Sequence, residues 1–202
     1  MLKSEVKVML HNILNGIPVI LASASPRRKE ILSLLGLSYD VVISSIAEPI
    51  TDEEPYIQAM RHAMGKTAAV DRPDALIIGA DTIVVLQDQI LGKPSDEAQA
   101  REYLKMLSGC EHEVITGICV RFHESYYSAH ARSKVRFSEL TDEEIKAYIS
   151  TGEPMDKAGA YGIQGYGSQF IYHIQGCYFN VMGFPVQTFY ALIQQMQEHG
   201  EL

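Results

Sequence analysis

Residues 19–32 constrain the fold most, because they predict a buried strand that turns directly into a helix. Val19–Ala22 is a short apolar run with the β-branched content of a strand. Ser25 suits the N-cap and Pro26 the first helical position, while Gly36 suits the C-cap. We expect the helix to bury one apolar face, made of Ile31, Leu32, Leu34 and Leu35.

The first turn of this helix carries Arg27, Arg28 and Lys29. Cations are disfavoured there, because the helix dipole is already positive at its N-terminus. One interpretation is a solvated basic turn that costs little. The other is an anion site, in which backbone N–H groups, two guanidinium groups and the hydroxyls of Ser23 and Ser25 meet phosphate oxygens.

Length and charge limit the function classes. The 202 residues suit one domain with a sizeable core, and the net charge of −8 argues against a general nucleic-acid binder. Three scattered cysteines fit neither a disulfide framework nor a zinc site, and no apolar run approaches membrane-spanning length. We therefore expect a cytoplasmic protein that binds neither nucleic acid nor membrane.

The N-terminus predicts an additional helix rather than a secretory signal, because His11 and Asn12 interrupt any apolar core of a signal peptide. One helical face would carry Val6, Met9, Leu10, Ile13 and Leu14. We expect residues 1–17 to be a helical extension and residues 18–202 to form a single domain of one or two lobes.

The remaining pattern predicts an α/β fold with a mixed sheet, because helices and strands alternate around a central antiparallel hairpin. Expected strands are 39–43, 75–79, 82–86, the hairpin 113–122 and 126–137, and 169–174. Expected helices begin at Pro55, at a Ser95 cap, at the capping box of Thr141 and Glu144, and at Pro185. Residues 159–167 are too glycine-rich for regular structure and predict a loop.

The helix from Pro55 to about Val70 has an apolar face that we expect to point inward: Ile57, Met60, Met64 and Ala68. Lys66 would then point away from the buried side.

Charged residues stand at the ends of the predicted elements. Asp81 lies between two apolar strand segments, where a carboxylate is costly unless a cation pairs with it. Arg27, Arg28, Glu48 and Lys93 join it, with Lys66 and the pair Asp156–Lys157 as a second tier. Carboxylates are ligands that Mg2+ prefers, and separate cations can neutralise a polyphosphate.

Ordinary interpretations compete at each position. Glu48 and Lys66 could be solvated surface charges, and Lys93 could belong to a turn. The seven histidines lack ligand spacing, and we interpret them as structural or exposed. No Walker A pattern occurs, which argues against a P-loop enzyme.

Together these segments resemble the Maf family of nucleoside triphosphate pyrophosphatases. The matching text is Leu21-Ala22-Ser23-Ala24-Ser25-Pro26-Arg27-Arg28, Gly79-Ala80-Asp81-Thr82-Ile83-Val84, Gly92-Lys93-Pro94, Ser108-Gly109, the run from Gly152 to Gly165, and Val181-Met182-Gly183-Phe184-Pro185. The resemblance covers nearly the whole chain from Pro18. Met64-Gly65 departs from it, as does the N-terminal extension.

The resemblance implies a Maf/ITPase-like fold, with a long curved mixed sheet, flanking helices and a cleft between two lobes. It implies hydrolysis of a nucleoside triphosphate to the monophosphate and pyrophosphate with a divalent metal, Mg2+ or Mn2+, with Co2+ as a further alternative. Asp81 matches the family's general base and Glu48 a metal-handling or water-handling carboxylate. The expected phosphate contacts are Ser23, Arg27, Arg28, Lys66, Lys93 and Lys157.

The resemblance also indicates a branch. Pro-Arg-Arg, Ala-Asp-Thr and Ile-Gln-Gly match the dTTP/UTP branch, so Arg27, Thr82 and Gln164 are the expected specificity residues. The amide of Gln164 offers both a donor and an acceptor to a pyrimidine edge. A 7-methylguanosine triphosphate pyrophosphatase and a non-catalytic nucleotide-binding regulator of cell division remain alternatives. The oligomeric state is open, with a homodimer as one alternative, and Asp81 could serve as base, metal ligand or both.

Overall fold

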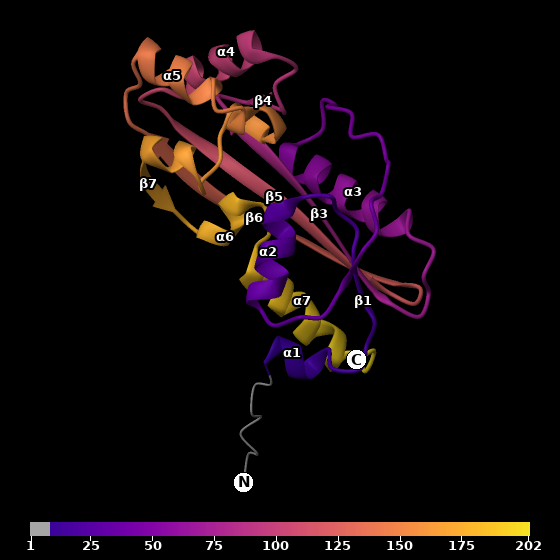
Figure 1. Cartoon of the computed structure of the whole chain (residues 1–202). Coiled ribbons are helices and arrows are strands. Elements are labelled where there is room, and N and C mark those ends of the chain that lie inside the picture. The colour runs from indigo at the N-terminus through magenta and orange to yellow at the C-terminus, as the bar shows by residue number, and fades with distance from the viewer. Residues whose placement is uncertain (1–8) are drawn as a thin grey trace.

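The computed structural model describes residues 9–202, which form a seven-stranded mixed sheet with helices on both faces (Figure 1). The strand order is β2-β1-β3-β5-β6-β7, with β4 paired to β3. Strands β1, β2 and β3 are parallel, and the remaining pairs are antiparallel. The strands are β1 (Val19–Leu21), β2 (Asp40–Val41), β3 (Leu76–Leu86), β4 (Gln89–Leu91), β5 (Glu111–Phe122), β6 (Ser125–Phe137) and β7 (Ile171–Gln175).

Figure 1 shows α3 on one side of the sheet and α2, α6 and α7 on the other, with α4 and α5 near one end of the long strands. The helices are α1 (Leu10–Ile13), α2 (Pro26–Leu34), α3 (Pro55–Ala68), α4 (Glu97–Leu107), α5 (Asp142–Ile149), α6 (Tyr178–Met182) and α7 (Val186–Glu198). Short 3-10 turns lie at Glu153–Asp156, Ala158–Ala160 and Tyr166–Phe170, and residues 161–165 of the glycine-rich segment are irregular, as expected for a loop. The expected α/β class and mixed sheet are confirmed.

Local signals located most elements correctly. The β5–β6 hairpin and the Thr141–Glu144 capping box are present, and Gly36 ends α2 with a φ of 69°. The N-cap of α4 is Asp96 instead of Ser95, because the Asp96 side chain accepts from the backbone N–H of Gln99. The strand expected over 39–43 shortens to β2, and the one expected over 169–174 begins at Ile171. The segments expected over 75–79 and 82–86 form one continuous strand, β3.

The edge of β3 has a gap in its pairing, and this gap locates the site. On that edge β1 pairs with Leu76–Ile78 and β4 pairs with Val84–Leu86. The intervening residues 79–83, with Asp81 at their centre, pair only with β5 on the opposite edge. A continuous sheet would satisfy these backbone groups and leave no room for a ligand at this position.

Two apolar clusters lie at opposite ends of one sheet face. One contains Ile78 and Ala80 of β3 with residues of α2 and α7, and the other contains Val84 of β3 with residues of α4 and α5. Between them on the same face stands Thr82, whose hydroxyl lies 3.1 Å from that of Thr116. The polar side chain of Thr82 thus separates the two clusters and lines a cavity on the sheet.

The orientation predicted for α3 is wrong. Ile57 and Met64 are each 41% exposed, and the buried face consists of Gln58, Ala59, His62, Ala63, Lys66 and Thr67. A Cβ on Gly117 would overlap the backbone of Ala59, and a Cβ on Gly79 would overlap the carbonyl of Ala63. Opposite these two glycines only small side chains such as those of Ala59 and Ala63 fit, so the larger apolar residues of the helix face outward.

Two further apolar predictions were only partly correct. Ile31 and Leu32 of α2 are buried and Leu35 is half-buried, but Leu34 is 71% exposed. Near the N-terminus, Leu10 and Leu14 pack into the cluster that contains α7, whereas Met9 is exposed. Val6 lies outside the described residues. Across residues 9–202, no helix is both long and apolar enough to cross a membrane.

The close approach of α3 predicts that Gly117→Ala destabilises the protein. The added methyl group meets helix backbone, which cannot rotate away as a side chain can, so we expect the free energy of unfolding to fall by about 2 kcal/mol or more. Thermal and urea unfolding measure the change. Gly92→Ala is the matched control, because its added Cβ would have only an ordinary contact at 3.9 Å. Equal stability of the two variants would contradict this close packing of α3 on β5.

Candidate functional site

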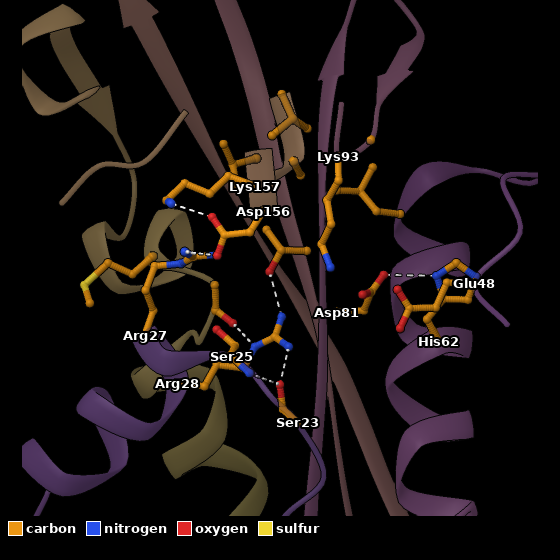
Figure 2. A pocket seen from close by; sticks show the side chains of 18 of the residues that line it. Ser23, Ser25, Arg27, Arg28, Glu48, His62, Asp81, Lys93, Asp156 and Lys157 are labelled. Carbon is orange, nitrogen blue, oxygen red and sulfur yellow. Dashed lines mark hydrogen bonds and ion pairs between the residues drawn. The ribbon is translucent and has the colours of Figure 1, made fainter. Parts of the chain in front are cut away.

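A cavity of about 630 Å³ opens beside the unpaired stretch of β3 (Figure 2). Its wall combines the turn after β1, the start of α2, the buried face of α3, and residues 156–163. This volume is typical of a site for a small organic ligand. In Figure 2, Arg27 and Arg28 lie on one side and Asp81 and Glu48 on the other. The Lys93 side chain extends between them.

Lys66 holds two carboxylates together in this cavity. Its Nζ lies 2.8 Å from Asp81 Oδ1 and 2.8 Å from Glu48 Oε1, and it donates to the carbonyl of Ala80 at 3.1 Å. These three contacts use all the N–H donors of an ammonium group. Lys66 is therefore buried and saturated, contrary to the outward orientation expected from the apolar pattern of α3.

His62 is a site residue that sequence reasoning missed. Its Nδ1 lies 3.0 Å from Asp81 Oδ2, and its side chain is 5% exposed. The interpretation of all seven histidines as structural or exposed is therefore wrong for His62. A signal was available, because His62 and Lys66 are four residues apart and share one face of a helix.

Asp81 is ionised in this environment. Burial by itself raises the pKa of its carboxyl group, but the hydrogen bond from His62 and the charges of Lys66 and Arg28 outweigh it. The net effect holds the pKa of Asp81 below its usual 3.8. The cost of burying this carboxylate is thus offset by cations and donors, as the sequence argument required.

Arg28 connects three parts of the site. Its Nη1 donates to Ser23 Oγ at 2.9 Å, its Nη2 to Thr82 Oγ1 at 3.2 Å, and its Nε to the carbonyl of Gly183 at 2.8 Å. Burial lowers the pKa of this guanidinium from its usual value, with partial compensation from Asp81. These contacts use three of the five N–H groups of Arg28 and leave two for a ligand.

The other predicted cations differ in whether they already form ion pairs within the protein. Arg27 Nη1 lies 3.7 Å from Asp156 Oδ2, and Lys157 Nζ lies 2.6 Å from Asp156 Oδ1. Among residues 9–202, Lys93 has no hydrogen bond or ion pair, although it lines the cavity. Lys93 is therefore the cation in this wall that can bind an incoming anion without breaking a contact within the protein.

The start of α2 also remains open to a ligand. Ser25 occupies the N-cap position as predicted, but its side chain makes no capping hydrogen bond. The N-terminal N–H groups of a helix that lacks a side-chain cap are suited to an anion.

The donor set fits a hard divalent cation. Asp81 and Glu48 each place an oxygen on the same Lys66 Nζ, so the two carboxylates lie close together. Mg2+ is usually held by one or two carboxylates together with substrate phosphates and water. Within the part of the chain that is described, no group of three or more His, Cys, Asp and Glu residues could hold a metal ion. A cation held by Asp81 and Glu48 would therefore need further ligands from phosphate or water.

Comparison with known families decides the relationship. A family model described as Maf-like protein matches residues 18–196. The chain belongs to the Maf family. The resemblance drawn from the motifs is confirmed.

Similar Maf-family proteins carry a specific name. One from Aquifex aeolicus, named dTTP/UTP pyrophosphatase, is 45% identical over 180 residues, which are 88% of this chain and 95% of the relative. A Bacillus cereus protein of the same name is 46% identical over 88% of this chain and 94% of its own length. The Ham1 protein of Staphylococcus aureus has a similar structure, with a TM-score of 0.52 at 13% identity, covering 91% of this chain and 99% of that chain. That likeness supports the expected fold.

The structure brings most of the predicted residues of this Maf protein to one cavity: Ser23, Arg27, Arg28, Glu48, Lys66, Asp81, Thr82, Lys93 and Lys157. Gln164 is outside this group. Its Nε2 donates to Glu30 Oε1 at 3.1 Å, although the neighbouring Gly162 and Ile163 do line the cavity. The specificity role expected for Gln164 stays a prediction.

The depressed pKa of Asp81 predicts a pH dependence of stability. Between the folded pKa and the unfolded value near 3.8, the unfolded chain binds more protons, so folding stability rises with pH across that range and is lost as pH falls through the folded pKa. In Asp81→Asn this contribution is absent. Urea unfolding from about pH 3 to about pH 6 should show a gentler rise below about pH 4 for the variant than for the wild type. The rise contributed by His112, whose burial lowers its pKa to about 4, is common to both curves. Parallel curves would contradict the environment assigned to Asp81.

Proposed function

We propose that this Maf protein hydrolyses dTTP and UTP between the α and β phosphates, releasing the nucleoside monophosphate and pyrophosphate. The observation that carries the proposal is the pair of carboxylates of Asp81 and Glu48, which face Arg27 and Arg28 across one cavity, with Lys93 extending between them. Anionic phosphates suit the cationic side of the cavity, and Asp81 and Glu48 would hold a divalent cation on its acidic side. The names of relatives 45–46% identical to this chain support the same substrates.

The reaction adds water across a phosphoanhydride bond. The water oxygen bonds to the α phosphorus, the bond from that phosphorus to the bridging oxygen breaks, and pyrophosphate leaves. Arg28 and Lys93 stabilise the negative charge that develops on the phosphates, and the open N-terminus of α2 offers further N–H donors. In this proposal Asp81 orients the water or accepts its proton.

Glu48 and Asp81 would hold the divalent metal, Mg2+ or Mn2+. When bound, the metal supplies Lewis-acid polarisation of the phosphoryl oxygens and lowers the pKa of water. The depressed pKa of Asp81 keeps its carboxylate ionised, which is the form that binds a cation. Its roles as metal ligand and as base both stay predictions.

Base recognition is the finer part of the proposal. Arg27 and Thr82 line the cavity, and the Gln164 segment lies at its border. The rival substrate is 7-methylguanosine triphosphate, and the rival class is a nucleotide-binding regulator of cell division that does not turn over its ligand. Cytoplasmic localisation and a homodimer stay predictions.

The decisive experiment measures pyrophosphate release from dTTP, UTP, CTP, GTP and 7-methylguanosine triphosphate. We expect turnover of dTTP and UTP, and a loss of kcat of at least about 100-fold in Asp81→Asn with nucleotide binding retained. The matched control is Asp71→Asn, the same chemical change at an exposed position outside the cavity. Preferred turnover of 7-methylguanosine triphosphate would reassign the substrate. Nucleotide binding without product from any nucleotide would favour the regulator.

Metal removal supplies a second prediction. Treatment with a chelator should abolish pyrophosphate release from dTTP, and added Mg2+ or Mn2+ should restore it, because without a cation the two carboxylates would repel the phosphates. Glu48→Gln should raise the metal concentration needed for half-maximal activity. Full activity in excess chelator would exclude a metal-dependent reaction.

A further inference from the structure

His62 contacts the carboxylate of Asp81 on the oxygen that Lys66 does not use. Lys66 Nζ lies 2.8 Å from Oδ1, and His62 Nδ1 lies 3.0 Å from Oδ2. Both donors come from successive turns of α3, whose position is set by its close packing on Gly79 and Gly117. Two donors of different chemistry therefore define both the position and the rotation of this carboxylate.

The second ring nitrogen of His62 determines the tautomer. Nε2 is buried and has no hydrogen-bond partner among the described residues. An ionised carboxylate can only accept, so Nδ1 must carry a proton to bond Asp81. A second proton on Nε2 would bury an unsatisfied donor and a charge, whereas a bare Nε2 leaves only an unpaired acceptor. The neutral ring with its proton on Nδ1 is the form that fits.

We propose that His62 is a positioning residue for the pyrophosphatase reaction: its Nδ1–H fixes the rotation of the Asp81 carboxylate, so that the carboxylate keeps a productive orientation toward metal and water. The effect of His62 on kcat rests on the proposed function, whereas its contact with Asp81 does not. Lys66 cannot perform this task alone, because its ammonium group is shared among Asp81, Glu48 and the Ala80 carbonyl.

Three substitutions separate this role from simple packing. His62→Leu fills similar space without a donor. His62→Asn places its amide nitrogen near the position of Nδ1, and His62→Gln places it about one carbon further out, near the position of Nε2. We expect kcat for dTTP to fall at least about tenfold in the Leu and Gln variants, with KM nearly unchanged, and to recover in the Asn variant.

Thermal unfolding of the three variants controls for misfolding. If a variant melts more than a few degrees below the wild type, a stabilising surface substitution is added to it. In this way kcat is compared among folded proteins. Wild-type kcat in His62→Leu, or equal losses in Asn, Gln and Leu, would overturn the positioning role.

A readout independent of activity tests the geometry. Two-bond proton–nitrogen NMR correlation of histidine-labelled wild-type protein reports which ring nitrogen carries the proton. We expect a protonated Nδ1 and a bare Nε2 for His62, with the signals assigned by their loss in His62→Asn. A proton on Nε2 with a bare Nδ1 would overturn the inference even in an active enzyme. If the wild type releases no pyrophosphate, the proposed function fails, and the tautomer still decides whether His62 donates to Asp81.

Discussion

The ion pair between Lys66 and Asp81 is the interaction on which the site depends. It allows a carboxylate to stand in a strand that is otherwise buried, at the point where the edge of β3 is unpaired. A lone carboxylate there would be protonated or would destabilise the fold. Because Lys66 also binds Glu48, one ammonium group both compensates the buried charge and gathers the two acids that suit a divalent cation.

This arrangement requires α3 to lie unusually close to the sheet. Gly79 and Gly117 provide the space, and Ala59 and Ala63 keep the helix side of the contact small. The result is a helix whose buried face carries the functional groups His62 and Lys66. Packing and chemistry therefore depend on the same contact, and a change at either glycine should affect both.

Some cations of the cavity are held by hydrogen bonds within the protein, and others are free to bind a ligand. Arg28 joins the turn after β1 to β3 and to the C-terminal end of α6, so it stabilises the site whether or not a ligand is present. Lys93 has no partner among the described residues and lines the cavity. A polyanion would thus meet one preorganised guanidinium and one uncommitted ammonium, an arrangement suited to charge that changes during a reaction.

The sequence by itself determined the α/β class, the central hairpin, the strand-turn-helix unit, the family, and most of the residues that line the cavity. Those features depend on local patterns, caps and spaced motifs, which act over a few residues. Only the tertiary structure decided which face of α3 is buried, that Lys66 lies between two acids, and that His62 contacts Asp81. These outcomes depend on how closely α3 approaches β3 and β5, which are distant from it in sequence. Apolar periodicity locates a buried helix face by its large side chains, so it cannot predict a contact made by backbone and small side chains.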